Sequence, residues 1–212
     1  SEKIIKSDFL VEPFKHIYLD DFLDEAHFQE IIKSVEIESP KNVKNDKELI
    51  HGLYDKGFKP ISFPGAVANE REYLNWREGR HDNQNKHTEC EGFGFVLRLY
   101  SVETPILKSL NEYIKGDEFN EVIAKKFGIT QSKLTSDGGI QKYLDGYEIS
   151  PHPDIRSKAL TFMVNINPSN ESESMNHHTR YMKLINERKY IQEFWEGNPE
   201  MERDWLPWSW LT

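Results

Sequence analysis

Residues 141–154 read QKYLDGYEISPHPD, and this stretch decides the fold that we expect of the chain. Its first residues read as a strand, and Asp145-Gly146 supplies a turn. His152 and Asp154 follow two positions apart, so an imidazole and a carboxylate at a strand end can project toward one point. A histidine from a distant strand would complete one face of an octahedral metal site and leave the opposite face open.

The His-x-Asp pair is a weak signal when it is taken alone. With 8 histidines and 36 acidic residues in 212 positions, about one His-x-Asp/Glu pair is expected by chance. One such match is His87-Thr88-Glu89, which lies in a polar stretch without a predicted strand, and we interpret it as solvated loop. The residues around His152 therefore carry the argument.

A longer pattern surrounds the pair. The stretch follows the order Tyr-x-x-Gly-x-x-apolar-x-x-His-x-Asp, which is filled by Tyr143, Gly146, Ile149, His152 and Asp154. This order resembles the prolyl-4-hydroxylase-like branch of the iron(II)- and 2-oxoglutarate-dependent oxygenases.

Three other segments are similar to the same family. The strand expected over Ala159–Ile166 leads into Asn167-Pro168, as the family's corresponding strand does. The opening Pro13–Leu23 resembles the family's first strand and helix. The tail, with its Trp-Leu-Pro-Trp motif at 205–208, is similar to a small branch found in phage and marine bacterial genomes.

The resemblance implies an α+β fold built on a double-stranded β-helix, the cupin-like jelly roll, with N-terminal helices packed on one sheet. We expect a single oxygenase-like domain over residues 1–212, in which residues 139–212 form the first part of the jelly-roll core. Residues 38–91 read as a long insertion, either a lid that faces substrate or a variable surface loop.

The resemblance also implies the chemistry. His152 and Asp154 would bind Fe(II), and Tyr143 would place its hydroxyl against the carboxylate of 2-oxoglutarate. An ordinary half-buried strand tyrosine is the alternative for Tyr143. The implied reaction hydroxylates a C–H bond, with succinate and CO2 as co-products. Its implied substrate is a small molecule or a peptide, with a peptidyl or free amino acid as the leading class.

The family's third metal ligand is a histidine well downstream, followed by an arginine or lysine that binds the far carboxylate of 2-oxoglutarate. Only His177 and His178 come after Asp154, and either could bind the metal only if the next strand crossed back to it. We expect both to be polar residues at a loop-to-strand junction, and the third ligand to be absent.

The late arginines do not follow a histidine in the family's order. We expect Arg203 to form a surface ion pair with Glu200 or Asp204, which contributes little to stability. We therefore interpret the sequence as incomplete at its C-terminus, without the last strands of the jelly roll, the distal histidine and the anchoring arginine.

Periodicity predicts the remaining elements. The first helix is expected to begin after Asp21 or Asp24, either of which can cap it. Gly128 is placed to end the helix over about Asp117–Phe127. The first predicted helix ends at about Val35. The other three span about Thr104–Lys115, Asp117–Phe127 and Glu187–Glu196. The predicted strands are residues 14–19, Gly92–Tyr100, Gly139–Leu144, Ala159–Ile166 and Thr179–Ile185.

Composition narrows the classes of partner. The formal net charge of -9 disfavours nucleic acid, whose phosphates are neutralised by Lys and Arg. No run approaches the roughly 20 apolar residues of a membrane helix, so no membrane partner is expected. A single cysteine, Cys90, excludes an internal disulfide framework and indicates a reducing, cytoplasmic location.

Two other functions compete with the oxygenase. The first is a non-catalytic jelly-roll module for binding or assembly, because Trp205, Trp208 and Trp210 would give the tail an apolar surface that docks a partner or a second copy in a homodimer. The second is a zinc hydrolase that uses the same His-x-Asp pair, and it ranks last because the sequence has no His-Glu-x-x-His or comparable cluster.

Overall fold

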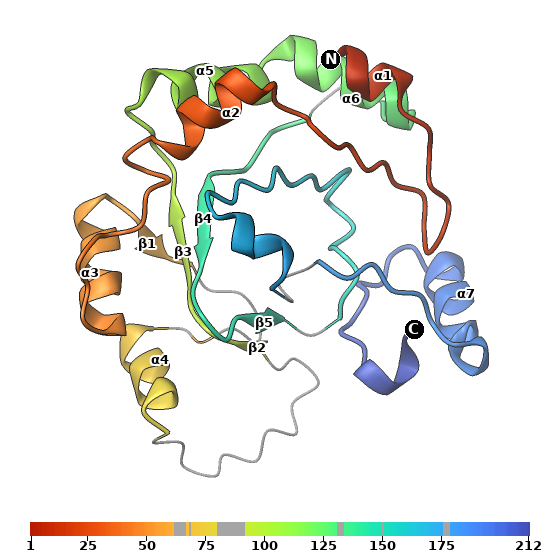
Figure 1. Ribbon diagram of the computed structural model, residues 1–212. Helices are drawn as coiled ribbons and strands as arrows, with labels where there is room; N and C mark the ends of the chain where they lie inside the picture. The colour runs from red at the N-terminus through yellow and green to blue at the C-terminus, as the bar shows by residue number, and fades with distance from the viewer. Residues whose placement is uncertain (62–66, 68, 80–91, 131–133, 150, 176–178) are drawn as a thin grey trace. The chain divides into compact units, whose positions relative to one another are not determined.

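The computed structural model describes residues 1–61, 67, 69–79, 92–130, 134–149, 151–175 and 179–212. Contacts divide the chain into two compact units, each built from three separate stretches (Figure 1). Unit 1 comprises Ser1–Glu38, Val102–Asp137 and Lys158–Tyr181, and unit 2 comprises Ser39–Ser101, Gly138–Ser157 and Met182–Thr212. The single domain over residues 1–212 stays a prediction.

The regular elements in the described part of unit 1 are helices, joined by long stretches without regular structure. Its elements are α1 (Glu2–Lys6), α2 (Glu25–Ile32), α5 (Pro105–Lys115), α6 (Asp117–Phe127) and the 3-10 turn η1 (Asn170–Glu173). The cap at Asp24 is confirmed, because its carboxylate accepts from the backbone N–H of His27 at 2.9 Å. The end of α6 at Gly128 is also confirmed, since Gly128 takes the left-handed conformation that glycine adopts freely.

A buried carboxylate caps α5 from outside that helix. Glu36 is 4% exposed, and one of its oxygens accepts from the backbone N–H of Glu103 at 2.7 Å and of Thr104 at 2.9 Å. Its other oxygen accepts from Thr104 Oγ1. Burial raises the pKa of Glu36, but the hydrogen bonds from Thr104 and Glu103 outweigh it and leave the pKa lowered. The ionised carboxylate therefore stabilises the start of α5.

We expect Glu36→Gln to lower the free energy of unfolding by about 1–3 kcal/mol at neutral pH, because an amide cannot replace the charged acceptor of these donors. A group whose pKa is lowered on folding stabilises above its ordinary value, here 4.5, and that contribution disappears as the pH falls through its folded-state pKa. Urea denaturation between about pH 7 and pH 3 should show the difference between wild type and variant narrowing with acid. A gap that stays constant across this range would contradict the assignment, and exposed Glu121→Gln is the control.

Unit 2 contains the described strands. Its elements are α3 (Asp46–Asp55), β1 (Lys59–Pro60), α4 (Glu70–Arg77), β2 (Gly92–Phe93), β3 (Val96–Leu99), β4 (Ile140–Tyr143), β5 (Glu148–Ile149), η2 (Asn186–Arg188), α7 (Tyr190–Gly197) and η3 (Trp208–Trp210). The strands form a three-stranded antiparallel sheet in the order β1-β3-β4 and an antiparallel pair β2-β5 (Figure 1). The double-stranded β-helix stays a prediction.

The centre of unit 2 is β3 and the residue that precedes it. Phe95, Val96 and Leu97 are fully buried, and Tyr73 of α4 stacks on Phe95 with ring centroids 5.7 Å apart. The sequence predicts one strand from Gly92 to Tyr100, whereas the structure divides it at Gly94. Gly94 has a φ of 80°, and a Cβ there would lie 2.3 Å from the Cα of Tyr147. The close approach of another backbone therefore explains the break.

The polar segment 38–91 contains two helices that the sequence analysis missed. Each begins at an asparagine whose side-chain oxygen accepts a hydrogen bond from the backbone N–H three residues later. Asn45 accepts from Glu48 at 2.9 Å, and Asn69 accepts from Glu72 at 3.1 Å. The repeated Asn-x-x-Glu is a helix-start signal, which could have located α3 and α4. The described part of this segment is therefore not the structureless loop that its composition indicates.

Three predicted strands are wrong as strands of the described chain. The structure assigns no strand to residues 14–19, 159–166 or 179–185, and records only the isolated bridges Leu10↔His16 and Leu184↔Leu211 near them. A strand needs a partner for its backbone groups as well as an alternating pattern. Phe162 and Met163 are also 44% and 49% exposed, so the pattern does not mark a buried face here.

The turn at Gly146 is packed too tightly for a side chain. Gly146 has a φ of 76°, and a Cβ there would lie 1.9 Å from Cη2 of Trp76. Gly79 has a similar φ of 70° but nothing within 4 Å. We expect Gly79→Ala to lower the free energy of unfolding by about 1–2 kcal/mol through backbone strain alone, and Gly146→Ala to lower it clearly more. Equal losses in denaturant titrations would contradict the contact between Gly146 and Trp76.

Candidate functional site

The residues before the His-x-Asp pair form the local structure that the sequence predicts. Strand β4 ends at Tyr143, and the N–H of Leu144 still bonds to the carbonyl of Phe95 at 3.0 Å. The chain turns at Asp145-Gly146 and enters β5, which pairs with β2. His152 therefore comes shortly after a short paired strand, in a segment, residues 151–155, that has no helix or strand of its own.

His152 and Asp154 each contact the C-terminal part of unit 2. His152 is an exposed residue, and its imidazole lies against the indole of Trp205, with ring centroids 4.3 Å apart and planes inclined by 34°. The backbone carbonyl of Asp154 accepts from Nη2 of Arg203. The predicted surface ion pair of Arg203 is wrong, because this half-buried guanidinium bonds to the backbone of the motif instead.

No third ligand joins the pair in the described chain. Among the residues that the structure describes, no group of three His, Cys, Asp or Glu side chains could hold a metal ion. The two low-ranked candidates, His177 and His178, lie outside the described residues, as does the match His87-Thr88-Glu89. The metal site therefore stays a prediction that rests on the spacing of His152 and Asp154.

Tyr143 lies in a cluster of polar and aromatic side chains on one face of β3 and β4. With its amide oxygen turned toward Arg98, Gln141 accepts from that guanidinium at 2.7 and 3.1 Å, and its amide nitrogen contacts the Tyr143 hydroxyl. The Tyr143 ring contacts Tyr147 with centroids 4.6 Å apart. Burial raises the pKa of Tyr143 despite the charge of Arg98, and raises that of Tyr147 to about 12. Both hydroxyls therefore stay protonated at neutral pH and can donate.

The opposite face of β4 carries a lysine with an unusual charge state, which the sequence analysis missed. The ammonium of Lys142 lies 5.7 Å from the ring centroid of Phe58. Burial, and then the charge of Lys56, lower the pKa of Lys142 to about 8. A lysine at an alternate position of a half-buried strand is the only signal for this in the sequence.

We expect the Lys142 amine to titrate near pH 8, in NMR spectra of the dimethylated protein, and Lys56→Gln to raise that value. Because the pKa is lower in the folded chain, the unfolded chain binds more protons between about pH 8 and pH 10.5, and stability should rise over that range. Lys142→Met should remove this rise. A Lys142 titration at the ordinary 10.5 would show that the amine is not desolvated.

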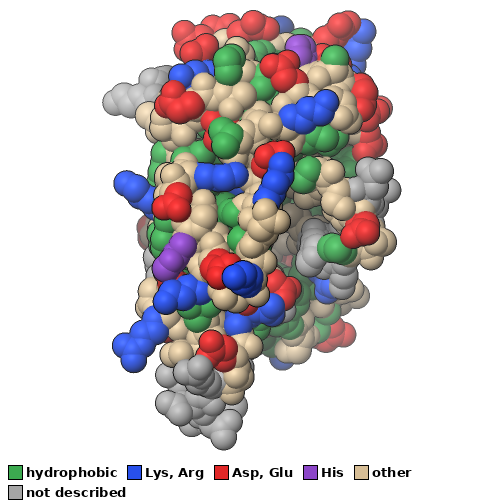
Figure 2. All heavy atoms as spheres, turned by 60° about the vertical axis from the view of Figure 1, so that its left-hand side comes forward, with side chains coloured by type: hydrophobic (Ala, Val, Ile, Leu, Met, Phe, Trp, Pro, Cys, Tyr) green, Lys and Arg blue, Asp and Glu red, His purple; other side chains and the backbone are tan. Residues whose placement is uncertain are grey.

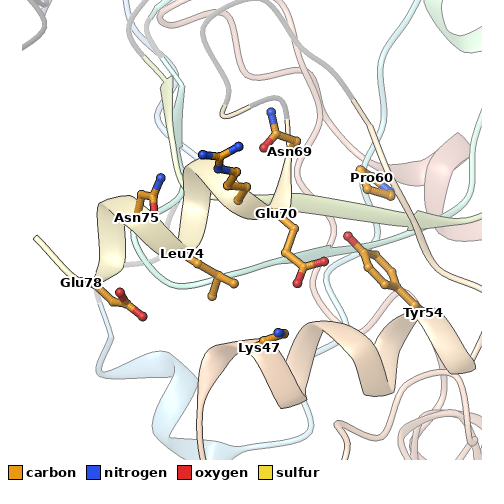
Figure 3. Close-up of a pocket in the computed structure, with 9 residues that line it drawn as sticks. Lys47, Tyr54, Pro60, Asn69, Glu70, Leu74, Asn75 and Glu78 are labelled. Atoms are coloured by element: carbon orange, nitrogen blue, oxygen red, sulfur yellow. The ribbon is translucent and has the colours of Figure 1, made fainter. Parts of the chain in front are cut away.

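A second candidate region is an open hollow of about 640 Å³ between α3 and α4 (Figure 3). Such a volume is within the range of small-molecule sites. Figure 3 shows Glu70 and Leu74 pointing from α4 toward α3, and Tyr54 reaching back from α3. The lining residues are Lys47, Tyr54, Pro60, Asn69, Glu70, Arg71, Leu74, Asn75 and Glu78.

Glu70 is the fixed charge of this hollow. Its side chain is 23% exposed, and its Oε1 lies 2.9 Å from Nε2 of His51. Burial raises the pKa of Tyr54 to about 12, with smaller contributions from the charge of Glu70 and from hydrogen bonding to it. Tyr54 therefore keeps its proton at neutral pH, and the hollow combines the Glu70 carboxylate with the cations Lys47 and Arg71.

On the face in Figure 2, basic and acidic side chains are interspersed. No helix in the described parts of the chain has the length and apolar character needed to cross a membrane. No family model, curated protein or solved structure matches the chain, so the class of protein is inferred from its own residues.

Proposed function

We propose that this chain is an iron(II)- and 2-oxoglutarate-dependent dioxygenase that hydroxylates a C–H bond of a peptidyl or free amino acid. The observation that supports it is the register of Tyr143, Gly146, Ile149, His152 and Asp154. A strand, a glycine turn and a second strand precede the His-x-Asp pair in the structure, as that pattern requires locally. A His-x-Asp pair that arose by chance could lie in any local structure and would not have to follow a strand, a turn and a second strand.

The donors present fit iron in kind. An imidazole nitrogen and a carboxylate oxygen are two ligands of the 2-His-1-carboxylate set, and His152 is an exposed residue. In the proposal these residues supply two of the three ligands, and His177 and His178, which lie outside the described residues, stay the low-ranked candidates for the third. When bound, iron would couple the decarboxylation of 2-oxoglutarate with O2, to succinate and CO2, to insertion of one oxygen atom into the substrate C–H bond.

The chain's own residues would orient the cosubstrate. The raised pKa of Tyr143 keeps its hydroxyl protonated, so that it can donate a hydrogen bond to a carboxylate oxygen of 2-oxoglutarate. Arg203 supplies a cation in direct contact with the motif through the carbonyl of Asp154. We place the protein in the cytoplasm, because a lone Cys90 suits a reducing compartment.

The alternative is a binding module without catalysis. The hollow between α3 and α4 favours it, because its anchored Glu70 and the cations Lys47 and Arg71 could hold a ligand without any metal. The terminal tryptophans favour it less than the sequence indicates: Trp205 lies against His152, and Trp210 lies under the guanidinium of Arg188 at 5.0 Å. Of the three, only Trp208 is exposed.

Metal binding separates the two functions. We expect the wild-type chain to bind Co(II), a stand-in for Fe(II), in anaerobic calorimetry. His152→Ala or Asp154→Ala should weaken this binding by at least about tenfold, because even the loss of a residue that only supports a metal ligand lowers metal affinity by that factor. His51→Ala, which removes an exposed histidine that contacts Glu70, should bind as the wild type does. Iron-dependent succinate release from 2-oxoglutarate should follow the same order. Binding that survives both motif substitutions would overturn the oxygenase proposal.

A further inference from the structure

The end of α7 and the residues that follow it form reciprocal contacts with the His-x-Asp segment, all within unit 2. Arg156, just after the motif, donates to the carbonyls of Trp195 at 2.6 Å and Asn198 at 3.3 Å. In the other direction, Arg203 donates to the carbonyl of Asp154. Each segment thus supplies a guanidinium to backbone acceptors of the other, and we name residues 195–206 the C-terminal segment.

The two segments also run together through their backbones. The N–H of Leu206 bonds to the carbonyl of Pro151 at 3.0 Å, and Leu206 itself is 7% exposed. These bonds are on either side of His152, with Pro151 before it and Asp154 after it. The position of His152 therefore depends on the C-terminal segment, since residues 151–155 have no strand or helix to fix them.

Trp205 contacts the imidazole in a way that is compatible with metal binding. Its indole covers the face of the His152 ring, at 4.3 Å between centroids and an inclination of 34°. A metal ion binds a ring nitrogen through the lone pair in the plane of the ring, at its rim. One imidazole can therefore keep the contact with Trp205 and hold a metal at the same time. The contact restricts the rotation of His152, which a ligand must otherwise lose on binding.

We propose that Trp205 is a positioning residue of the site, and that the C-terminal segment holds His152 in the orientation that binds the metal. This inference rests on the proposed function, because it assigns a role around His152 as a ligand. Aromatic contacts of this kind correspond to about a two- to tenfold change in an equilibrium constant. The expected effect of Trp205 on metal affinity is of that size, smaller than the loss of His152 itself.

Co(II) binding to a matched set of variants tests the proposal. We expect Trp205→Ala to weaken Co(II) binding by about two- to tenfold, and Trp205→Phe to restore most of the affinity because a phenyl ring can still cover the imidazole. Trp208→Ala, an exposed tryptophan three residues on, should bind as the wild type does. Equal affinities for wild type and Trp205→Ala, or an equal loss in Trp208→Ala, would overturn the role of Trp205.

Spectra of the metal-free protein keep this inference separate from the oxygenase proposal. The indole ring current should shift the His152 ring protons in wild type, and the shift should disappear in Trp205→Ala and remain in Trp208→Ala. If His152→Ala and Asp154→Ala leave Co(II) binding intact, the oxygenase proposal fails whatever these spectra show. If Co(II) binding needs His152 but the ring-current shift is missing from wild type, the proposal for Trp205 fails alone.

Discussion

The antiparallel pairing of β3 with β4 is the constraint on which the candidate site depends. Leu97 pairs with Lys142 and Val96 with Tyr143, so the buried strand fixes the register of the strand that leads to the motif. Because side chains alternate across a strand, this register places Tyr143 with Arg98 and Gln141 on one face, and Lys142 on the other. A shift by one residue would exchange the faces and place the Tyr143 hydroxyl where Lys142 now lies.

The turn after β4 sets where β5 begins, so contacts that hold this turn also position β5. Tyr73 donates its hydroxyl to the carbonyl of Asp145 at 3.2 Å, and burial raises the pKa of Tyr73 to about 12, so it keeps this proton. Arg77 reaches the carboxylates of Asp145 at 2.6 Å and Asp46 at 2.7 Å, and the Asp46 hydrogen bond leads the causes that raise the pKa of this guanidinium. Helix α4 thus holds the turn through two donors, the neutral hydroxyl of Tyr73 and the charged guanidinium of Arg77. This helix therefore helps to position the motif, whether or not the segment 38–91 also covers a substrate.

The sequence predicts the local elements better than their partners. The helices α5 and α6 could be predicted because an apolar stripe and Gly128 depend only on neighbouring residues, and the turn at Gly146 could be predicted for the same reason. The strand over residues 159–166 could not be judged, because alternation shows what a strand would bury but not which edge would pair with it. Helices α3 and α4 were missed because they lie in a segment rich in Lys, Asn, Gly and Pro, which indicates a loop, and because their Asn-x-x-Glu starts were not recognised as caps.

The candidate site shows the same division between local and distant information. His152 and Asp154 are legible in the sequence because their spacing is local, whereas the contact of Trp205 with His152 joins residues far apart in the chain. A tryptophan near a terminus predicts an exposed apolar surface only if nothing else in the fold needs a large flat side chain. Here the indole of Trp205 lies against the imidazole of His152, and Trp205 is only partly exposed. An aromatic residue that the sequence assigns to an exposed surface is therefore partly buried by contacts within its own unit.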